Sequence, residues 1–87
     1  MKIEINKKEY EFKNTYKGVK YFEENYNKSL TNIFSKDAKF TDLIELFYSF
    51  LIVDNEFDMN IDDFYEYIND NPVLINDFQT VLLGKKK

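Results

Sequence analysis

The first thirteen residues, MKIEINKKEYEFK, alternate apolar and polar side chains with a single break at residues 6–8. Alternation of this kind places every second side chain on the same face of a β-strand. The apolar face comprises Met1, Ile3 and Ile5 in the first strand and Tyr10 and Phe12 in the second. Asn6 tolerates a positive φ, which favours a tight turn between the strands. Residues 1–13 therefore predict a β-hairpin, and because an isolated hairpin is marginal in water, its apolar face must dock on the remaining chain.

After the hairpin, the alternation gives way to helical spacing. The first helix is predicted to begin after Asn14 or Thr15, either of which can cap it. Its inner stripe is Tyr16, Val19, Phe22 and Tyr26. Gly18 lies inside this stripe and weakens the helix, which predicts that another element packs closely against it. Residues 27–39 are polar and predict a connector that contains at most a short helix.

The second helix is predicted to begin at Thr41 as its cap, with Asp42 and Glu45 in the first turn, where the helix dipole favours negative charge. Its apolar residues cover nearly every side: Leu43, Ile44, Leu46, Phe47, Phe50, Leu51 and Val53. Such a helix is either the buried centre of a fold or contributes a face to a partner.

Two further helices are predicted in the last third of the chain. Asn60 caps the third helix, and Asp63 approximates a capping box. Asn71 caps the fourth, with Pro72 at its first position and Gly84 as its C-cap. The predicted fold is α+β and mainly α: a hairpin over 1–13 docked on a small bundle of three to five helices over 14–83, followed by a basic tail at 84–87, all in one domain over 1–87.

The amino-acid composition argues against several kinds of functional site. The 87 residues include no cysteine, histidine or arginine and only two glycines. These absences argue against disulfides, thiolate zinc sites, a histidine base, an arginine fork for phosphate and a glycine-rich phosphate loop. No apolar run approaches the roughly 20 residues that span a bilayer, and no signal peptide is recognisable at the start. We therefore expect a cytosolic protein that does not bind membranes.

Charge is unevenly distributed. Residues 1–39 hold nine lysines and six acids, whereas residues 40–84 hold ten acids and no lysine. A half that carries only negative charge repels nucleic acid and attracts a basic protein surface, with an affinity that falls as salt rises. We therefore expect a basic protein partner and no direct contact with nucleic acid.

Three patterns with catalytic or metal-binding associations are each better explained by ordinary structure. Residues 54–62 carry oxygen ligands at alternate positions, but the sixth and twelfth positions of a calcium loop would be Met59 and Tyr65 rather than glycine and glutamate. Glu11 and Lys13 form an E-x-K pair without an upstream aspartate, and no histidine is present to activate a serine. We expect no catalytic residue, no metal and no cofactor.

Sixteen aromatic rings, nine Phe and seven Tyr, are difficult to enclose completely in a chain of this size. Most must belong to the core, but an exposed aromatic patch rimmed by carboxylates is typical of a protein-binding surface. The alternative is that exposed rings are scattered singly, as on most proteins. The predicted partner-binding residues are Phe47, Phe50, Phe57, Phe64, Tyr65, Asp62, Asp63 and Glu66.

The opening MKIEINKKEYEFKNTYKGVKYFEE, the apolar segment TDLIELFYSFLI and the acidic segment NIDDFYEYI occur in an order that resembles one known family. This family is the tail assembly chaperones of long, non-contractile-tailed phages of Gram-positive hosts. The resemblance covers most of the chain and rests on Ile3, Ile5, Tyr10, Phe12, Phe22 and Glu23. Its hydrophobic patterns are moderately specific, and Lys7 stands where the family usually has a turn glycine.

The resemblance implies a non-enzymatic protein that binds the tape measure protein while the tail tube assembles. The expected binding segments of the tape measure protein are basic amphipathic helices. It implies a location in the host cytoplasm and absence from the mature virion. Such families often make a longer form by ribosomal frameshifting, and residues 84–87 could be encoded by a slippery A-run or be an ordinary solubilising tail. The longer form and a second copy of this chain are further candidate partners.

Two other functions stay open from the sequence. A small acidic inhibitor, of the anti-CRISPR or anti-restriction type, would place carboxylates where a nuclease expects phosphates. Several carboxylates, however, are better explained by helix starts, which favours the chaperone. A toxin–antitoxin or regulatory adaptor is the third alternative.

Overall fold

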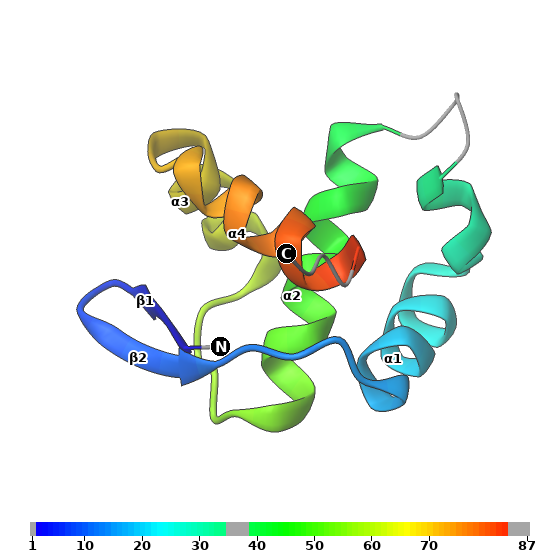
Figure 1. Ribbon diagram of the computed structural model, residues 1–87, viewed down its shortest axis with the longest axis horizontal. Coiled ribbons are helices and arrows are strands. Elements are labelled where there is room, and N and C mark those ends of the chain that lie inside the picture. The colour runs from blue at the N-terminus through cyan, green and yellow to red at the C-terminus, as the bar shows by residue number, and fades with distance from the viewer. Residues whose placement is uncertain (1, 35–38, 84–87) are drawn as a thin grey trace.

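The structure is a computed structural model, and it describes residues 2–34 and 39–83. The expected Gly84 C-cap, the basic tail at 84–87 and the placement of Met1 lie outside these residues. An antiparallel hairpin precedes the helices, so the predicted α+β, mainly α, class is confirmed. In Figure 1, helix α2 runs through the middle of the molecule, and the other elements surround it.

The hairpin consists of β1 (Lys2–Ile5) and β2 (Lys8–Glu11), with Ile3 opposite Tyr10. Asn6 and Lys7 connect the strands with φ values of 56° and 72°. Two consecutive positive φ values are typical of the type I′ turn that suits a two-residue hairpin. The prediction of a tight turn at Asn6 is therefore confirmed, with a lysine in the left-handed conformation where glycine is usual.

The apolar face of the hairpin docks as expected. Ile3, Ile5 and Phe12 are buried. The Asn55 side chain attaches β2 to the end of α2, because it accepts from the Glu11 N–H at 3.0 Å and donates to the Glu11 and Leu51 carbonyls at 2.8 and 2.9 Å. At the turn, the Asn6 N–H donates to the Tyr67 hydroxyl at 2.9 Å. The hairpin is thus held at one end by the residue that follows α2 and at the other by a residue of α3.

Helix α1 (Tyr16–Tyr26) is capped by Thr15, whose hydroxyl accepts from the Gly18 N–H at 3.2 Å. Gly18 is buried where α1 crosses α2. A Cβ at this position would overlap Phe50 Cδ1 and lie 2.8 Å from Phe50 Cε1. The expected close packing at Gly18 is therefore confirmed, and Phe50 is the neighbour. A short 3-10 helix, η1 (Leu30–Phe34), follows α1.

Helix α2 (Phe40–Asp54) begins earlier than the sequence predicted. Lys39, not Thr41, is its N-cap, and the Asp42 carboxylate accepts from the Lys39 N–H at 3.0 Å. Asp42 therefore satisfies the free backbone donor from inside the first turn, and Thr41 is exposed. Of the two alternatives for this helix, the structure supports the buried centre, since a continuous stretch from Leu46 to Leu51 is buried.

Helices α3 (Ile61–Asp70) and α4 (Val73–Leu83) complete the fold. Asn60 caps α3 as predicted, accepting from the Asp63 N–H at 2.9 Å. Pro72 stands one residue before the first residue of α4, and the Asn71 carbonyl accepts from the Leu74 N–H at 3.1 Å. The proline thus marks the start of the fourth helix, within one residue of its predicted place.

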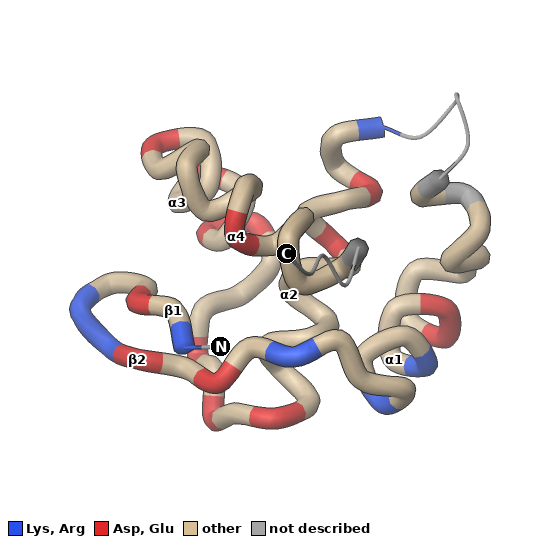
Figure 2. Tube along the Cα trace, viewed as in Figure 1, with Lys and Arg blue, Asp and Glu red and all other residues tan. Residues whose placement is uncertain are grey.

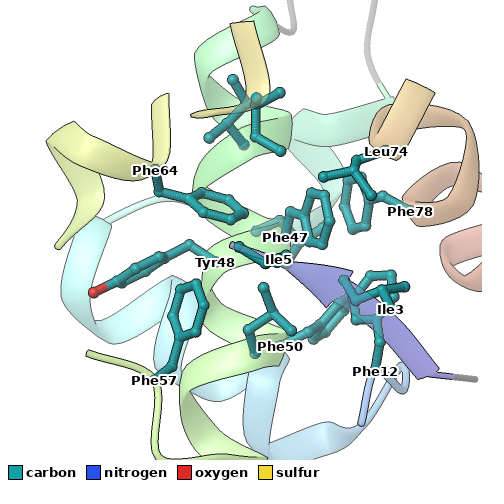
Figure 3. Close-up of a cluster of buried hydrophobic side chains, with 14 of the residues drawn as sticks. Ile3, Ile5, Phe12, Phe47, Tyr48, Phe50, Phe57, Phe64, Leu74 and Phe78 are labelled. Carbon is teal, nitrogen blue, oxygen red and sulfur yellow. The ribbon is translucent and has the colours of Figure 1, made fainter. Parts of the chain in front are cut away.

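The core is one cluster that draws side chains from every element around α2. Figure 3 shows Phe47 near its centre, with rings from the hairpin, α3 and α4 around it. Phe47 stacks on Phe78 with ring centroids 4.9 Å apart, contacts Phe64 edge-on at 5.2 Å and lies 4.8 Å from Phe12. Aromatic pairs at these distances add to the stabilisation from burial.

Candidate functional site

Burial removes four of the eight predicted partner-binding residues from the surface. Phe47, Phe50 and Phe64 have no exposed surface, and Phe57 is 8% exposed. Their rings pack against one another and against the hairpin (Figure 3). The sequence predicts them at a partner surface because sixteen aromatic rings are difficult to enclose completely, but the core includes all four.

The other four predicted residues lie on α3 at or near the surface. Asp62, Asp63 and Glu66 are exposed, and Tyr65 is half-buried. Asp62 and Asp63 stand in the first turn, where negative charge is favoured by the helix dipole. These two carboxylates therefore have a structural reason to be present, and Glu66 in the middle of the helix does not share it.

Tyr65 and Glu66 line a shallow groove between the start of α2 and α3. We call it the α2–α3 groove, and its lining residues are Phe40, Thr41, Ile44, Tyr65, Glu66 and Asn69. Its volume is about 330 Å³. Phe40 is 53% exposed, whereas Ile44 beside it is buried. The groove thus combines an exposed ring, an apolar floor and a carboxylate.

Sequence reasoning missed Phe40 because it placed the helix cap at Thr41. With that cap, Phe40 would precede the helix. With Lys39 as the cap, Phe40 becomes the first helical residue. The Asp42 carboxylate at the third helical position was the signal that could have revealed this start, since it can reach back to the N-cap backbone.

A polar network fixes the orientation of Tyr65. Its hydroxyl donates to one Glu45 oxygen at 2.9 Å, and the Lys28 ammonium donates to the other at 2.7 Å. Lys28 also donates to Asp42 at 2.5 Å. The network therefore links the connector after α1 to α2 and α3, and it positions the inner wall of the groove.

These contacts shift the ionisation of the network. Burial, followed by the bond to Glu45, raises the pKa of Tyr65 to about 12. The hydrogen bond from Lys28 is the main cause that lowers the pKa of Asp42, and the same bond raises the pKa of Lys28. At neutral pH, Tyr65 is therefore a neutral donor, and Lys28 is charged and engaged with two carboxylates.

The electrostatic environment of the groove is negative. Figure 2 shows lysines on the hairpin and α1 and at the start of α2, whereas α3 and α4 carry only acidic charges. Residues 40–84 contain ten acids and no lysine. Glu66 and its neighbour Asp62 are exposed and so present their charge to the solvent. A cationic ligand would be attracted to this face, and an anionic one repelled.

The described residues bring no three acidic side chains together as a metal site. No helix within 2–34 and 39–83 has the length and hydrophobicity to span a bilayer. Comparison of the chain with protein-family models, with curated proteins and with solved structures finds no match. The α2–α3 groove offers apolar contact, the Tyr65 hydroxyl held by Glu45 and the exposed Glu66 carboxylate.

Proposed function

We propose that this chain is a tail assembly chaperone of long, non-contractile-tailed phages. It binds basic amphipathic helical segments of the tape measure protein in the host cytoplasm, without catalysis, and is absent from the mature virion. The observation that carries the proposal is the α2–α3 groove, where the exposed ring of Phe40 lies beside the Glu66 carboxylate.

The physical basis is helix-in-groove recognition. An amphipathic helix lays an apolar face into a hydrophobic groove, with anchors spaced three and four residues apart. Phe40 and Ile44 are themselves one helical turn apart and supply the apolar contact. Lysines on the flanks of the incoming helix would meet Glu66 and Asp62. Because these charges are exposed, added salt weakens the complex.

The direct test is a calorimetric titration, in which synthetic peptides that tile the tape measure protein are added to this chain. Phe40→Ala should weaken binding by roughly tenfold or more if Phe40 is an anchor. Its stability should change little, because the ring is half exposed. Tyr16→Ala is the matched control: Tyr16 is an aromatic residue with 78% exposure at a different place on the surface, and binding should be unchanged.

If no tape measure segment binds, or if Phe40→Ala and Tyr16→Ala bind equally well, the proposal is wrong. The gene neighbourhood offers an independent check. A major tail protein gene upstream and a very long helical open reading frame downstream support the chaperone, and their absence argues against it.

The acidic inhibitor is the second candidate, and the all-negative stretch at residues 40–84 is the observation that favours it. Three of these carboxylates are engaged in the fold: Asp42 and Glu45 bind Lys28, and Asp54 lies 4.0 Å from Lys17. Tight, salt-sensitive binding to a DNA-cutting nuclease, together with no binding to tape measure segments, would favour this alternative.

A further inference from the structure

The two outer edges of the hairpin differ in their surroundings. In a two-residue hairpin the residues flanking the turn, Ile5 and Lys8, form a hydrogen-bonded pair, and such pairs alternate along the ladder. The backbone groups of Lys2 and Glu4 therefore point away from β2. The same alternation directs the Glu11 backbone away from β1, and the Asn55 side chain meets it there.

The outer edge of β2 is occupied at Glu11. Asn55 occupies the Glu11 position, and Phe57 packs edge-on against Tyr10 at 5.0 Å. The outer edge of β1 instead borders an open groove of about 420 Å³, whose lining includes Glu4, Lys7, Tyr67 and Val73. The Tyr67 hydroxyl accepts from the Asn6 N–H at the turn, before the outward-pointing Glu4 and Lys2. Within residues 2–34 and 39–83, no backbone hydrogen bond from outside the hairpin reaches Lys2 or Glu4. An exposed strand edge of this kind is a template for another strand.

The sequence of β1 is complementary to itself in one antiparallel register. Outward-pointing residues must oppose outward-pointing residues for their backbones to bond. With two copies centred on Ile3, each Lys2 lies opposite Glu4 of the other copy. Centring on Lys2 or on Glu4 would instead place like charges opposite each other, which is destabilising.

We propose that a second copy of this chain docks on the β1 edge in the Ile3-centred register and joins the two hairpins into one four-stranded sheet. Lys2 and Glu4 exchange backbone hydrogen bonds with Glu4 and Lys2 of the other copy, and their side chains pair across the new boundary. The overlap is only a few residues, so the dimer is transient rather than obligate. The α2–α3 groove lies elsewhere on the molecule, and this proposal does not depend on the chaperone function.

The test is sedimentation velocity over about 1 μM to 1 mM protein, the range in which weak association becomes visible. The wild-type chain should show a reversible monomer–dimer equilibrium. Glu4→Lys places lysine opposite Lys2 of the other copy and should weaken the dimer at least tenfold. Within the hairpin, the same change removes the Glu4–Glu9 repulsion, so the monomer stays folded.

Glu9→Lys is the matched control, because it makes the same charge change, relieves the same repulsion and lies on β2 away from the proposed boundary. It should leave the dimer intact. Lys2→Glu alone should be monomeric, but mixing it with Glu4→Lys makes every cross-copy pair opposite in charge and should give a heterodimer.

A wild-type chain that is monomeric up to about 1 mM overturns the proposal. So does a dimer that Glu4→Lys and Glu9→Lys weaken equally, because that result reflects net charge rather than the β1 edge. Failure of the two single variants to associate when mixed rejects the Ile3-centred register. Circular dichroism of each variant establishes that the fold is retained.

Discussion

Gly18 shows how a single missing side chain sets the distance between two helices. The Phe50 Cα would lie only 3.1 Å from a Cβ at position 18, so the backbones of α1 and α2 themselves are close. Phe50 is completely buried. Gly18 therefore lowers the helix propensity of α1 but allows α1 and α2 to pack closely.

Gly18→Ala tests whether close packing outweighs helix propensity at this position. Alanine gains about 1 kcal/mol of helix propensity, but overpacking costs about 1–3 kcal/mol. We expect a net loss of about 1 kcal/mol in the free energy of unfolding, measured by urea denaturation. Combining the change with Phe50→Leu should cost less than the sum of the two single changes. A stabilised Gly18→Ala protein would contradict the close contact.

Lys28 illustrates how one residue can control the response to pH. Its bonds lower the pKa of Asp42 below the usual 3.8. A carboxyl group whose pKa is lower in the folded state contributes its full stabilisation above the unfolded pKa and loses it as the pH falls through the folded pKa. The contribution of Lys28 to stability should therefore fade in acid.

Lys28→Met should lower the free energy of unfolding by about 1–2 kcal/mol at pH 7, since the ammonium is partly exposed and two carboxylates lose their cationic partner. The difference in the free energy of unfolding between variant and wild type should become smaller in urea titrations carried down to about pH 3. Lys17→Met is the control, because the Lys17 side chain is 71% exposed and its contact to Asp54 is long, at 4.0 Å. A difference that is independent of pH would show that Asp42 is not involved.

At the scale of elements, the turn of the hairpin carries backbone strain. Lys7 adopts a φ of 72°, a conformation that costs a residue with a Cβ about 1–2 kcal/mol. Asn6, the first turn residue, tolerates the same region more readily because its side chain is short and polar. The strain therefore falls mainly on the second turn position.

Lys7→Gly should stabilise the protein by about 0.5–1 kcal/mol, because relief of the strained φ exceeds the extra freedom of glycine in the unfolded chain. Thermal unfolding followed by circular dichroism measures the change. Lys8→Gly, one residue later in β2, should instead destabilise by a similar amount, since glycine weakens a strand. Equal effects at both positions would contradict the type I′ assignment.

At the scale of the whole molecule, Phe47 joins elements that are distant in the sequence. Its ring contacts Phe12 after β2, Phe64 on α3 and Phe78 on α4. Loss of this ring leaves a cavity that all these elements border. The hairpin and the helices should consequently unfold together rather than one after another.

Phe47→Ala should cost about 3–5 kcal/mol, which is a large share of the total stability of a small domain. Fluorescence from tyrosine and the circular dichroism of the helices should report one coincident transition at lower denaturant concentration. A small loss of stability with retained fold would return Phe47 to the candidate binding residues, as the sequence first suggested.

Short-range patterns in the sequence sufficed to predict the hairpin, the helix start at Asn60 and close packing at Gly18, and they narrowed the first helix start to Asn14 or Thr15. Alternation, capping and helix propensity act over only a few residues. The sequence could not show which rings are buried. Phe47 and Phe50 have the same local pattern whether α2 faces a core or a partner, and only the enclosure of α2 by the hairpin, α1, α3 and α4 decides between them. The α2–α3 groove likewise depends on where two helices meet, so Phe40 became a candidate only in three dimensions.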